Sequence, residues 1–224
     1  MQIGSIFVAE HGDVRCFISK CGHIETNVGF IENRAQKEAI IIDPAFGAYQ
    51  ASKAIFAPDT KITAVFFTHG HWDHIGDAHI FKKFGATTFA HKLDKFWIEQ
   101  PDLMAMFSGI VESFMACAID REVKDNDTFC INRWLDIHCR WVPGHASGDL
   151  SIYLPTLKCV FAGDTLFKGC IGRSDLPGGD KKLLISGIKE KILTLPDDTI
   201  VIPGHGDTTT IGDEKANNAF LQSL

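Results

Sequence analysis

Thr68-His-Gly-His-Trp-Asp-His74 is the part of this sequence that says most about its fold, because it packs three histidines and one aspartate into six positions. Neutral imidazole and carboxylate groups are good ligands for borderline divalent metals. His69 and His71 are two residues apart and can point the same way from a loop. Asp73 and His74 follow in the next turn and can face a second ion. A loop that only capped a helix would not need so dense a cluster, so the stretch predicts a metal site.

An apolar strand leads into this cluster, and the same arrangement recurs three times farther along the chain. The four strands and the polar residues that follow them are Val65-Phe-Phe-Thr before His69, Trp141-Val-Pro before Gly144-His145, Val160-Phe-Ala before Gly163-Asp164, and Val201-Ile-Pro before Gly204-His205. Loops at strand ends are where rigid scaffolds display reactive groups. Taken singly, each later residue could be structural. Their order after strands predicts that they meet at one edge of a sheet.

The remaining elements alternate between strands and helices, which predicts a layered sheet-and-helix domain spanning residues 1–224. The expected strands are Ala39–Ile42, Ala64–Thr68, Thr87–Ala90, Arg140–Val142, Cys159–Ala162 and Ile200–Ile202. Thr26–Glu32 and Ala39–Ile42 flank a polar turn and are expected to form a hairpin. The expected helices are Ala48–Phe56, Ile75–Phe84 and Lys181–Leu193.

Bulk composition narrows the function classes. A chain of 224 residues is long enough for one well-formed core. Its formal net charge of −6 disfavours a nucleic-acid partner, and no apolar run approaches the roughly 20 residues of a membrane helix. The N-terminus has no signal-peptide pattern, so a cytoplasmic protein is expected. The seven cysteines include no CxxC pair, which favours free thiols.

The series His-x-His-x-Asp-His, Gly-His, Gly-Asp, Gly-His resembles the signature of the metallo-β-lactamase superfamily. The resemblance implies an α/β fold of four layers, αβ/βα, with two mixed sheets face to face and helices on the outer faces. It also implies two metal ions. His69, His71 and His145 would hold one ion, Asp73, His74 and His205 the other, and Asp164 would bridge them. Zinc is the expected metal, and iron and manganese are alternatives because the same ligands serve all three.

Two longer segments are similar to the glyoxalase II-type subgroup, the hydroxyacylglutathione hydrolases and their short relatives. They run from Gly163 to Asp180 and from Pro203 to Phe220. The chain departs from the subgroup at Asp43-Pro-Ala, where Asp-Pro-Gly is typical, and after Gly144-His. It also lacks the C-terminal helical extension of the larger enzymes. The resemblance therefore implies hydrolysis of a small-molecule thioester, such as a hydroxyacyl-glutathione, and supports glutathione as the thiol half less strongly.

The expected mechanism uses two cations about 3.5–4 Å apart that lower the pKa of a shared water toward about 7. The resulting hydroxide would attack the thioester carbonyl, and Asp73 would orient it and accept its proton. Lys168 and Arg173 follow Asp164 and could hold a substrate carboxylate, or they could be surface charges. The apolar segment 96–115 could pack in the core or form a Met-rich lid, and Trp72 could line the pocket or pack.

Three other activities of the same superfamily are alternatives. A persulfide dioxygenase would use one iron held by two histidines and one aspartate. The Pro-Gly-His-Gly pattern at 203–206 favours the hydrolase. A tRNA-processing nuclease is disfavoured by the acidic balance. A lactamase is disfavoured because lactamases are mostly exported, and many carry Cys at the bridging position, where this chain has Asp164. Cys170 lies nearby in the sequence and is not expected to bind metal.

Overall fold

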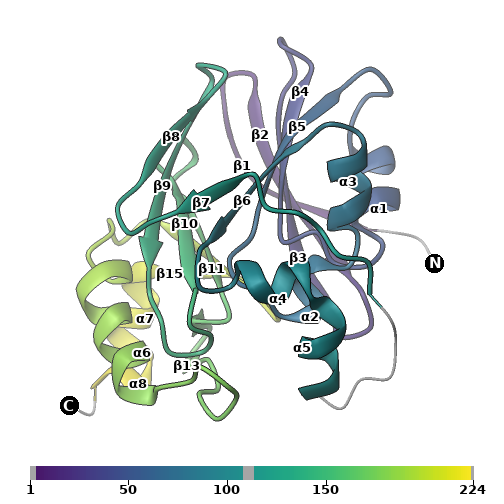
Figure 1. Cartoon of the computed structure of the whole chain (residues 1–224). Helices are drawn as coiled ribbons and strands as arrows, with labels where there is room; N and C mark the ends of the chain where they lie inside the picture. The colour runs from purple at the N-terminus through teal and green to yellow at the C-terminus, as the bar shows by residue number, and fades with distance from the viewer. Residues whose placement is uncertain (1–3, 108–113, 223–224) are drawn as a thin grey trace.

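Two β-sheets packed face to face form the centre of the molecule (Figure 1). The computed structural model describes residues 4–107 and 114–222. The first sheet has the order β1-β2-β3-β4-β5-β6-β7. Its strands are β1 (Ser5–His11), β2 (Val14–Cys21), β3 (Thr26–Asn33), β4 (Glu38–Ile42), β5 (Lys61–Phe66), β6 (Thr87–His91) and β7 (Arg121–Val123). Neighbours are antiparallel from β1 to β4 and parallel from β4 to β7.

The second sheet has the order β15-β14-β11-β10-β9-β8. Its strands are β8 (Thr128–Ile131), β9 (Leu135–Trp141), β10 (Leu150–Leu154), β11 (Cys159–Gly163), β14 (Ile200–Pro203) and β15 (Thr209–Thr210). All neighbours are antiparallel except β11 and β14, which are parallel. A short hairpin of β12 (Leu166–Phe167) and β13 (Cys170–Ile171) follows β11.

Helices cover the outer face of each sheet. On the first sheet these are α1 (Ala48–Ile55) and α3 (Ala78–Lys83), with α2 (Trp72–Ile75), α4 (Lys95–Glu99) and α5 (Pro101–Phe107) near one end. On the second they are α6 (Lys181–Gly187), which continues into a π-helical turn at Ile188–Ile192, then α7 (Ile211–Asn217) and α8 (Ala219–Gln222). None of these helices is long and apolar enough to cross a membrane.

Side-chain alternation explains the four layers. On β4, Ile40 and Ile42 join the core between the sheets, while Ile41 joins the core under α1 and α3. On β11, Phe161 faces the inter-sheet core, while Val160 packs toward α6. Successive residues of a strand point to opposite faces, so strands with apolar residues at every position can be covered on both sides. The expected αβ/βα sandwich of two mixed sheets is confirmed.

All six predicted strands are present, and β3 and β4 form the expected hairpin. The prediction of one helix over Ile75–Phe84 was wrong: the chain forms α2 and then α3. The Asp77 carboxylate accepts hydrogen bonds from the backbone N–H groups of Gly47 and Tyr49. Gly76 lies so close to Phe46 that a Cβ there would be 2.7 Å from the Phe46 nitrogen. These contacts hold Gly76 and Asp77 against the loop before α1 and interrupt the predicted helix between α2 and α3.

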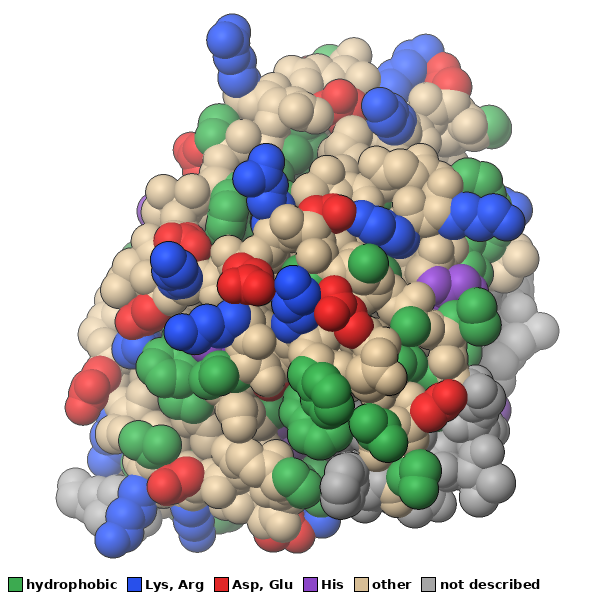
Figure 2. All heavy atoms as spheres, viewed as in Figure 1, with side chains coloured by type: hydrophobic (Ala, Val, Ile, Leu, Met, Phe, Trp, Pro, Cys, Tyr) green, Lys and Arg blue, Asp and Glu red, His purple; other side chains and the backbone are tan. Residues whose placement is uncertain are grey.

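Of the two arrangements considered for segment 96–115, packing in the core holds only in part. Ile98 and Phe114 are buried, whereas Leu103, Met106 and Met115 are exposed. Residues 108–113 and the side chains of 104, 105 and 107 lie outside the described part. Apolar side chains gather in the lower half of the face in Figure 2, below a band of charged groups. Trp72 packs, because its ring centroid is 5.8 Å from that of Phe114.

Candidate metal centre

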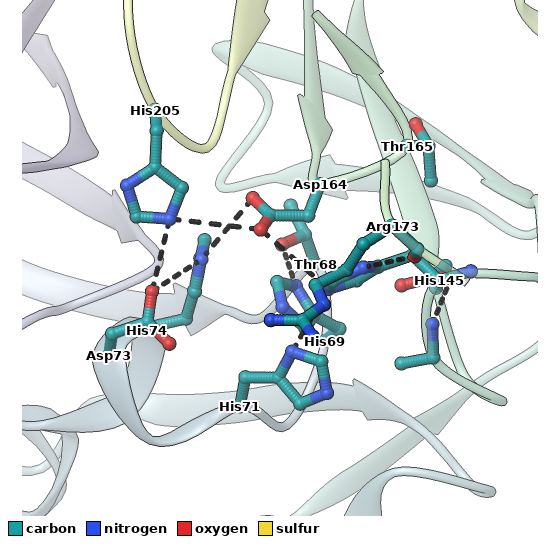
Figure 3. A network of polar contacts seen from close by, with 12 residues as sticks. Thr68, His69, His71, Asp73, His74, His145, Asp164, Thr165, Arg173 and His205 are labelled. Carbon is teal, nitrogen blue, oxygen red and sulfur yellow. Dashed lines mark hydrogen bonds and ion pairs between the residues drawn. The ribbon is translucent and has the colours of Figure 1, made fainter. Parts of the chain in front are cut away.

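The ends of β5, β9, β11 and β14 meet at one edge of the sandwich, as the sequence predicted. The backbone N–H of Gly204 donates to the carbonyl of Gly163 across 2.8 Å, which joins the loops after β14 and β11. The N–H of Leu150 donates to the Thr68 carbonyl across 2.7 Å, which joins the first sheet to the second. Figure 3 shows the seven predicted ligand side chains converging there from both sheets.

One group of three ligands consists of His69, His71 and His145. Their ligand atoms all lie within 4.8 Å of one another. The closest pair is His71 Nδ1 and His145 Nε2, which are 2.9 Å apart. Burial lowers the pKa of all three imidazoles, that of His71 to about 3. These side chains are therefore neutral near pH 7, which is the form that binds metal ions.

The second group consists of Asp73, His74 and His205. The Asp73 Oδ2 atom is 3.2 Å from His74 Nε2 and 3.1 Å from His205 Nε2. Burial lowers the pKa of His74, but the carboxylates of Asp73 and Asp43 outweigh it and hold that pKa well above its usual value. Burial likewise lowers the pKa of His205, and its hydrogen bond with Asp73 and the charge of Asp164 raise it overall. The carboxylates thus make this group attractive to cations.

Asp164 lies between the two groups. Its Oδ1 is 3.5 Å from His74 Nε2, while its Oδ2 is 3.6 Å from His145 Nε2 and 3.7 Å from His205 Nε2. Burial raises the pKa of Asp164, but the neighbouring His74, His145 and His205 lower it below its usual value overall. An ionised carboxylate that lies close to histidines of both groups is positioned to bridge two cations.

Hydrogen bonds to the other ring nitrogen orient four of the five histidines. His145 Nδ1 is 2.9 Å from the Arg173 carbonyl, and His205 Nδ1 is 3.0 Å from the Ile24 carbonyl. A carbonyl can only accept, so both Nδ1 atoms carry a proton and both Nε2 atoms face the site. Partners of this kind fix the tautomer and ring orientation of metal-binding histidines.

Asp43 orients the other two histidines, His69 and His74. The sequence pattern did not identify it as a site residue. Its Oδ2 is 3.0 Å from His74 Nδ1 and accepts the Thr68 hydroxyl proton at 2.6 Å. Since Thr68 has donated its only hydroxyl proton, it accepts from His69 Nδ1 at 3.0 Å. His69 and His74 therefore also present Nε2 to the site. The sequence signal was an aspartate at the end of a buried strand, in Asp43-Pro-Ala.

The side chains fit divalent cations. His69 Nε2, His74 Nε2 and Asp164 Oδ1 are buried and have no hydrogen-bond partner. An unsatisfied buried polar atom is costly, and a coordinated cation would satisfy all three. The donors are nitrogen and oxygen atoms only, a set that suits zinc, iron and manganese alike. The arrangement is a binuclear-type His/Asp metal site. The donor atoms do not select which of these metals binds.

The glycines before the ligands allow the loops to approach this closely. A Cβ at Gly204 would lie 2.0 Å from Asp164 Oδ1 and 2.8 Å from His74 Cε1. Gly163 has φ +54°, and a Cβ there would lie 2.5 Å from Thr68 Oγ1. The repeated glycine in the sequence pattern therefore reflects the close packing of loops around the metal site.

The two predicted substrate residues lie in and just after the β12–β13 hairpin beside the site. Lys168 is exposed in the turn between β12 and β13. The Arg173 guanidinium is exposed and makes two hydrogen bonds with Asp175, each 2.8 Å, while its main-chain carbonyl orients His145 (Figure 3). Cys170 is exposed in the hairpin, and its thiol hydrogen-bonds the carbonyl of Ile171. It is absent from the ligand groups found among the described residues.

Comparison with known proteins assigns the family. Residues 22–205 match the metallo-β-lactamase superfamily. The chain belongs to this superfamily. Hydroxyacylglutathione hydrolase GloC of Haemophilus influenzae is 37% identical over 192 residues, covering 84% of this chain and 89% of that protein. With the His/Asp centre described above, this places the chain among the superfamily's metal-dependent hydrolases.

Two solved structures of the superfamily are also similar. A structure titled BLEG-1 B3 metallo-β-lactamase superposes with a TM-score of 0.84 at 33% identity, over 92% of this chain and 99% of that one. TTHA1623, solved in a di-iron-bound form, superposes with a TM-score of 0.75 at 31% identity, over 90% and 98% of the two chains. Superfamily members this similar therefore include one that binds two iron ions.

Proposed function

We propose that this metallo-β-lactamase superfamily protein hydrolyses small thioesters of the hydroxyacyl-glutathione type. The observation that carries the proposal is the complete pair of ligand groups with Asp164 between them, in a chain 37% identical to a hydroxyacylglutathione hydrolase. Bound divalent ions would supply Lewis-acid activation of a water molecule and of the substrate carbonyl. The protein's part is to fix the positions of the ligand side chains and to set their protonation states.

Asp73 is better suited to be a ligand and hydrogen-bond acceptor than a strong base. Burial raises its pKa, but His74 and His205 hold it well below the usual value. A carboxylate with so low a pKa remains ionised and releases an accepted proton at once. Thr26 supports it, since the Thr26 hydroxyl lies 3.2 Å from the Asp73 carbonyl oxygen. Asp73 would therefore orient the attacking water and pass its proton on to solvent.

Arg173 and Lys168 remain the proposed anchors for an anionic part of the substrate. Both are exposed cations in the segment that follows Asp164, Lys168 in the β12–β13 turn and Arg173 just after β13. Arg173 would exchange Asp175 for a substrate carboxylate, a replacement of one bidentate partner by another.

Hydrolysis of β-lactams is a second candidate, favoured by the 33% identity to the structure titled a B3 metallo-β-lactamase. Both reactions need water to attack a carbonyl, and they differ in the leaving group, which is a thiolate in a thioester and the ring nitrogen in a β-lactam. Substrate preference therefore decides between them.

The test measures metal content and substrate preference on the same preparation. Elemental analysis should find two divalent ions per chain, and hydrolysis of S-lactoylglutathione should have a kcat/KM at least 100-fold above that of a cephalosporin. A His71→Ala variant provides the matched control, because it removes a ligand of one group only. A single iron per chain together with oxygen uptake on a persulfide would replace the proposal with persulfide oxidation. A preference for the cephalosporin would select the lactamase.

A further inference from the structure

Asp94 is a fully buried carboxylate beside the metal centre that no ligand group includes. It lies just before α4, and only 1% of its surface is exposed. Its Oδ2 accepts the backbone N–H of Gly70 at 2.8 Å, and its Oδ1 accepts the backbone N–H of Gly148 at 2.7 Å. One carboxylate thus holds two loops, one from each sheet.

The two loops supply the three histidines of the first group. Gly70 lies between His69 and His71, and Gly148 lies three residues after His145. Both contacts are close: a Cβ at Gly70 would lie 3.0 Å from the Asp94 carbonyl oxygen, and a Cβ at Gly148 would lie 2.6 Å from Asp94 Oδ1. The geometry therefore leaves little freedom in the separation of the two loops.

A second buried carboxylate completes the support of His145. Asp149 Oδ2 accepts the backbone N–H groups of His145 at 2.9 Å and Ala146 at 2.6 Å. Asp149 belongs to the same loop as His145, so it shapes that loop. Asp94 is the residue that ties this loop to the loop of His69 and His71.

We infer that Asp94 is a positioning residue that sets the distance between the two halves of the His69, His71 and His145 group, and thereby the affinity of that group for its metal ion. The Asp73, His74 and His205 group depends on it less, because Asp73 and His74 follow Gly70 in the same segment but further contacts outside the reach of Asp94 hold the residues of this group. Thr26 contacts Asp73, and the Asn27 amide donates to the carbonyls of Pro203 and Gly206 at 2.9 and 3.0 Å. The inference rests on the metal centre and not on the substrate.

Asp94→Asn removes one acceptor and keeps the side-chain volume. The new amide can still accept one of the two backbone N–H groups, but its NH2 must face the other, and two donors repel. The loop that faces this NH2 would have to move away from it. Loss of an outer partner of a metal ligand costs about 10- to 100-fold in metal affinity, so we expect a loss of that size at the first group.

The experiment measures each group alone by combining Asp94→Asn with a ligand deletion. His205→Ala leaves the first group intact, and His71→Ala leaves the second. Zinc is titrated into each metal-free protein in competition with a chromophoric chelator. Asp94→Asn should raise the Kd about 10- to 100-fold in the His205→Ala background and less than 2-fold in the His71→Ala background. An equal rise in both backgrounds, or no rise in either, would overturn the inference.

Two further variants separate positioning from general damage. Asp120→Asn removes a carboxylate that accepts from the N–H and hydroxyl of Thr88 in the same sheet, away from the metal loops, and should leave both Kd values unchanged. Gly148→Ala places a methyl group against the Asp94 carboxylate. It should reproduce the selective loss of affinity at the first group if Asp94→Asn does not fold. A Gly148→Ala protein with an unchanged first-group Kd would also contradict the inference.

Discussion

The carboxylate of Asp43 lies 3.0 Å from Nδ1 of His74, at the end of a different strand from the metal-ligand cluster. It accepts from the Thr68 N–H at 2.7 Å as well, so it joins the strand end of β4 to the loop after β5. Both groups of ligands depend on this contact, directly through His74 and through Thr68 for His69. Asp43 is thus the point at which the two metal positions are linked through the protein.

Asp43→Asn should weaken metal binding at both positions, more strongly at the second. The Asn amide cannot accept at every contact that Asp43 makes, and its NH2 would face a donor. We expect about a 10- to 100-fold loss of affinity at the second position, measured by chelator competition. Asp59→Asn is the control, because Asp59 is an exposed partner of Lys37. Unchanged zinc content under competition in Asp43→Asn would contradict this role.

Acidification should remove the metal of the second group first. Protons compete with metals for a histidine only where its pKa is high enough to bind them. His74 and His205 have raised pKa values, so they take up protons early as the pH falls, whereas His71, with a pKa of about 3, stays neutral. Metal per chain after gel filtration should fall from two to one as the pH is lowered, before the His69, His71 and His145 group loses its ion. Earlier loss in His205→Ala than in His71→Ala would reverse the assignment.

Gly204→Ala should abolish binding of at least one ion. The new Cβ would fall 2.0 Å from Asp164 Oδ1, so either the bridging carboxylate or the His205 loop must move. Gly206→Ala is the matched control two residues away. It has φ +75° and open space at its Cβ, so it should cost only about 1 kcal/mol of stability and leave metal content unchanged. Elemental analysis and thermal unfolding of both variants make the measurement.

Arg173→Ala should raise the KM for an anionic thioester several-fold and leave kcat and metal content unchanged. The guanidinium is exposed, whereas the main-chain carbonyl that orients His145 remains in the variant. Lys215→Ala, which breaks an exposed pair with Asp197, is the control. A fall in kcat without a change in KM would place Arg173 in a structural role instead.

Local sequence was enough to find the residues that the structure brings together as the candidate metal centre. Two short-range patterns were sufficient: the density of His and Asp at 69–74, and the recurrence of an apolar strand followed by Gly-His or Gly-Asp. A strand of this kind ends at a sheet edge whatever its position in the sheet, so the residue after it is displayed there. The same period-2 and apolar-run signals located β4, β5, β11 and β14. They did not locate β1, β2, β7, β8, β10 or the two-residue strands. They also missed the end of α2, where contacts of Gly76 and Asp77 with the loop before α1 stop the helix.

The supporting residues could be recognised only in the tertiary structure. Asp43 and Asp94 each read in the sequence as an ordinary turn or helix-start aspartate, and their partners lie 24 to 54 residues away. Which backbone N–H faces a carboxylate depends on how the two sheets pack against each other. The sequence alone determined the chemical identity of the candidate ligand side chains, because identity is a local property. The packing of the two sheets decided their separation, tautomers and charge, because these depend on groups brought together only by folding.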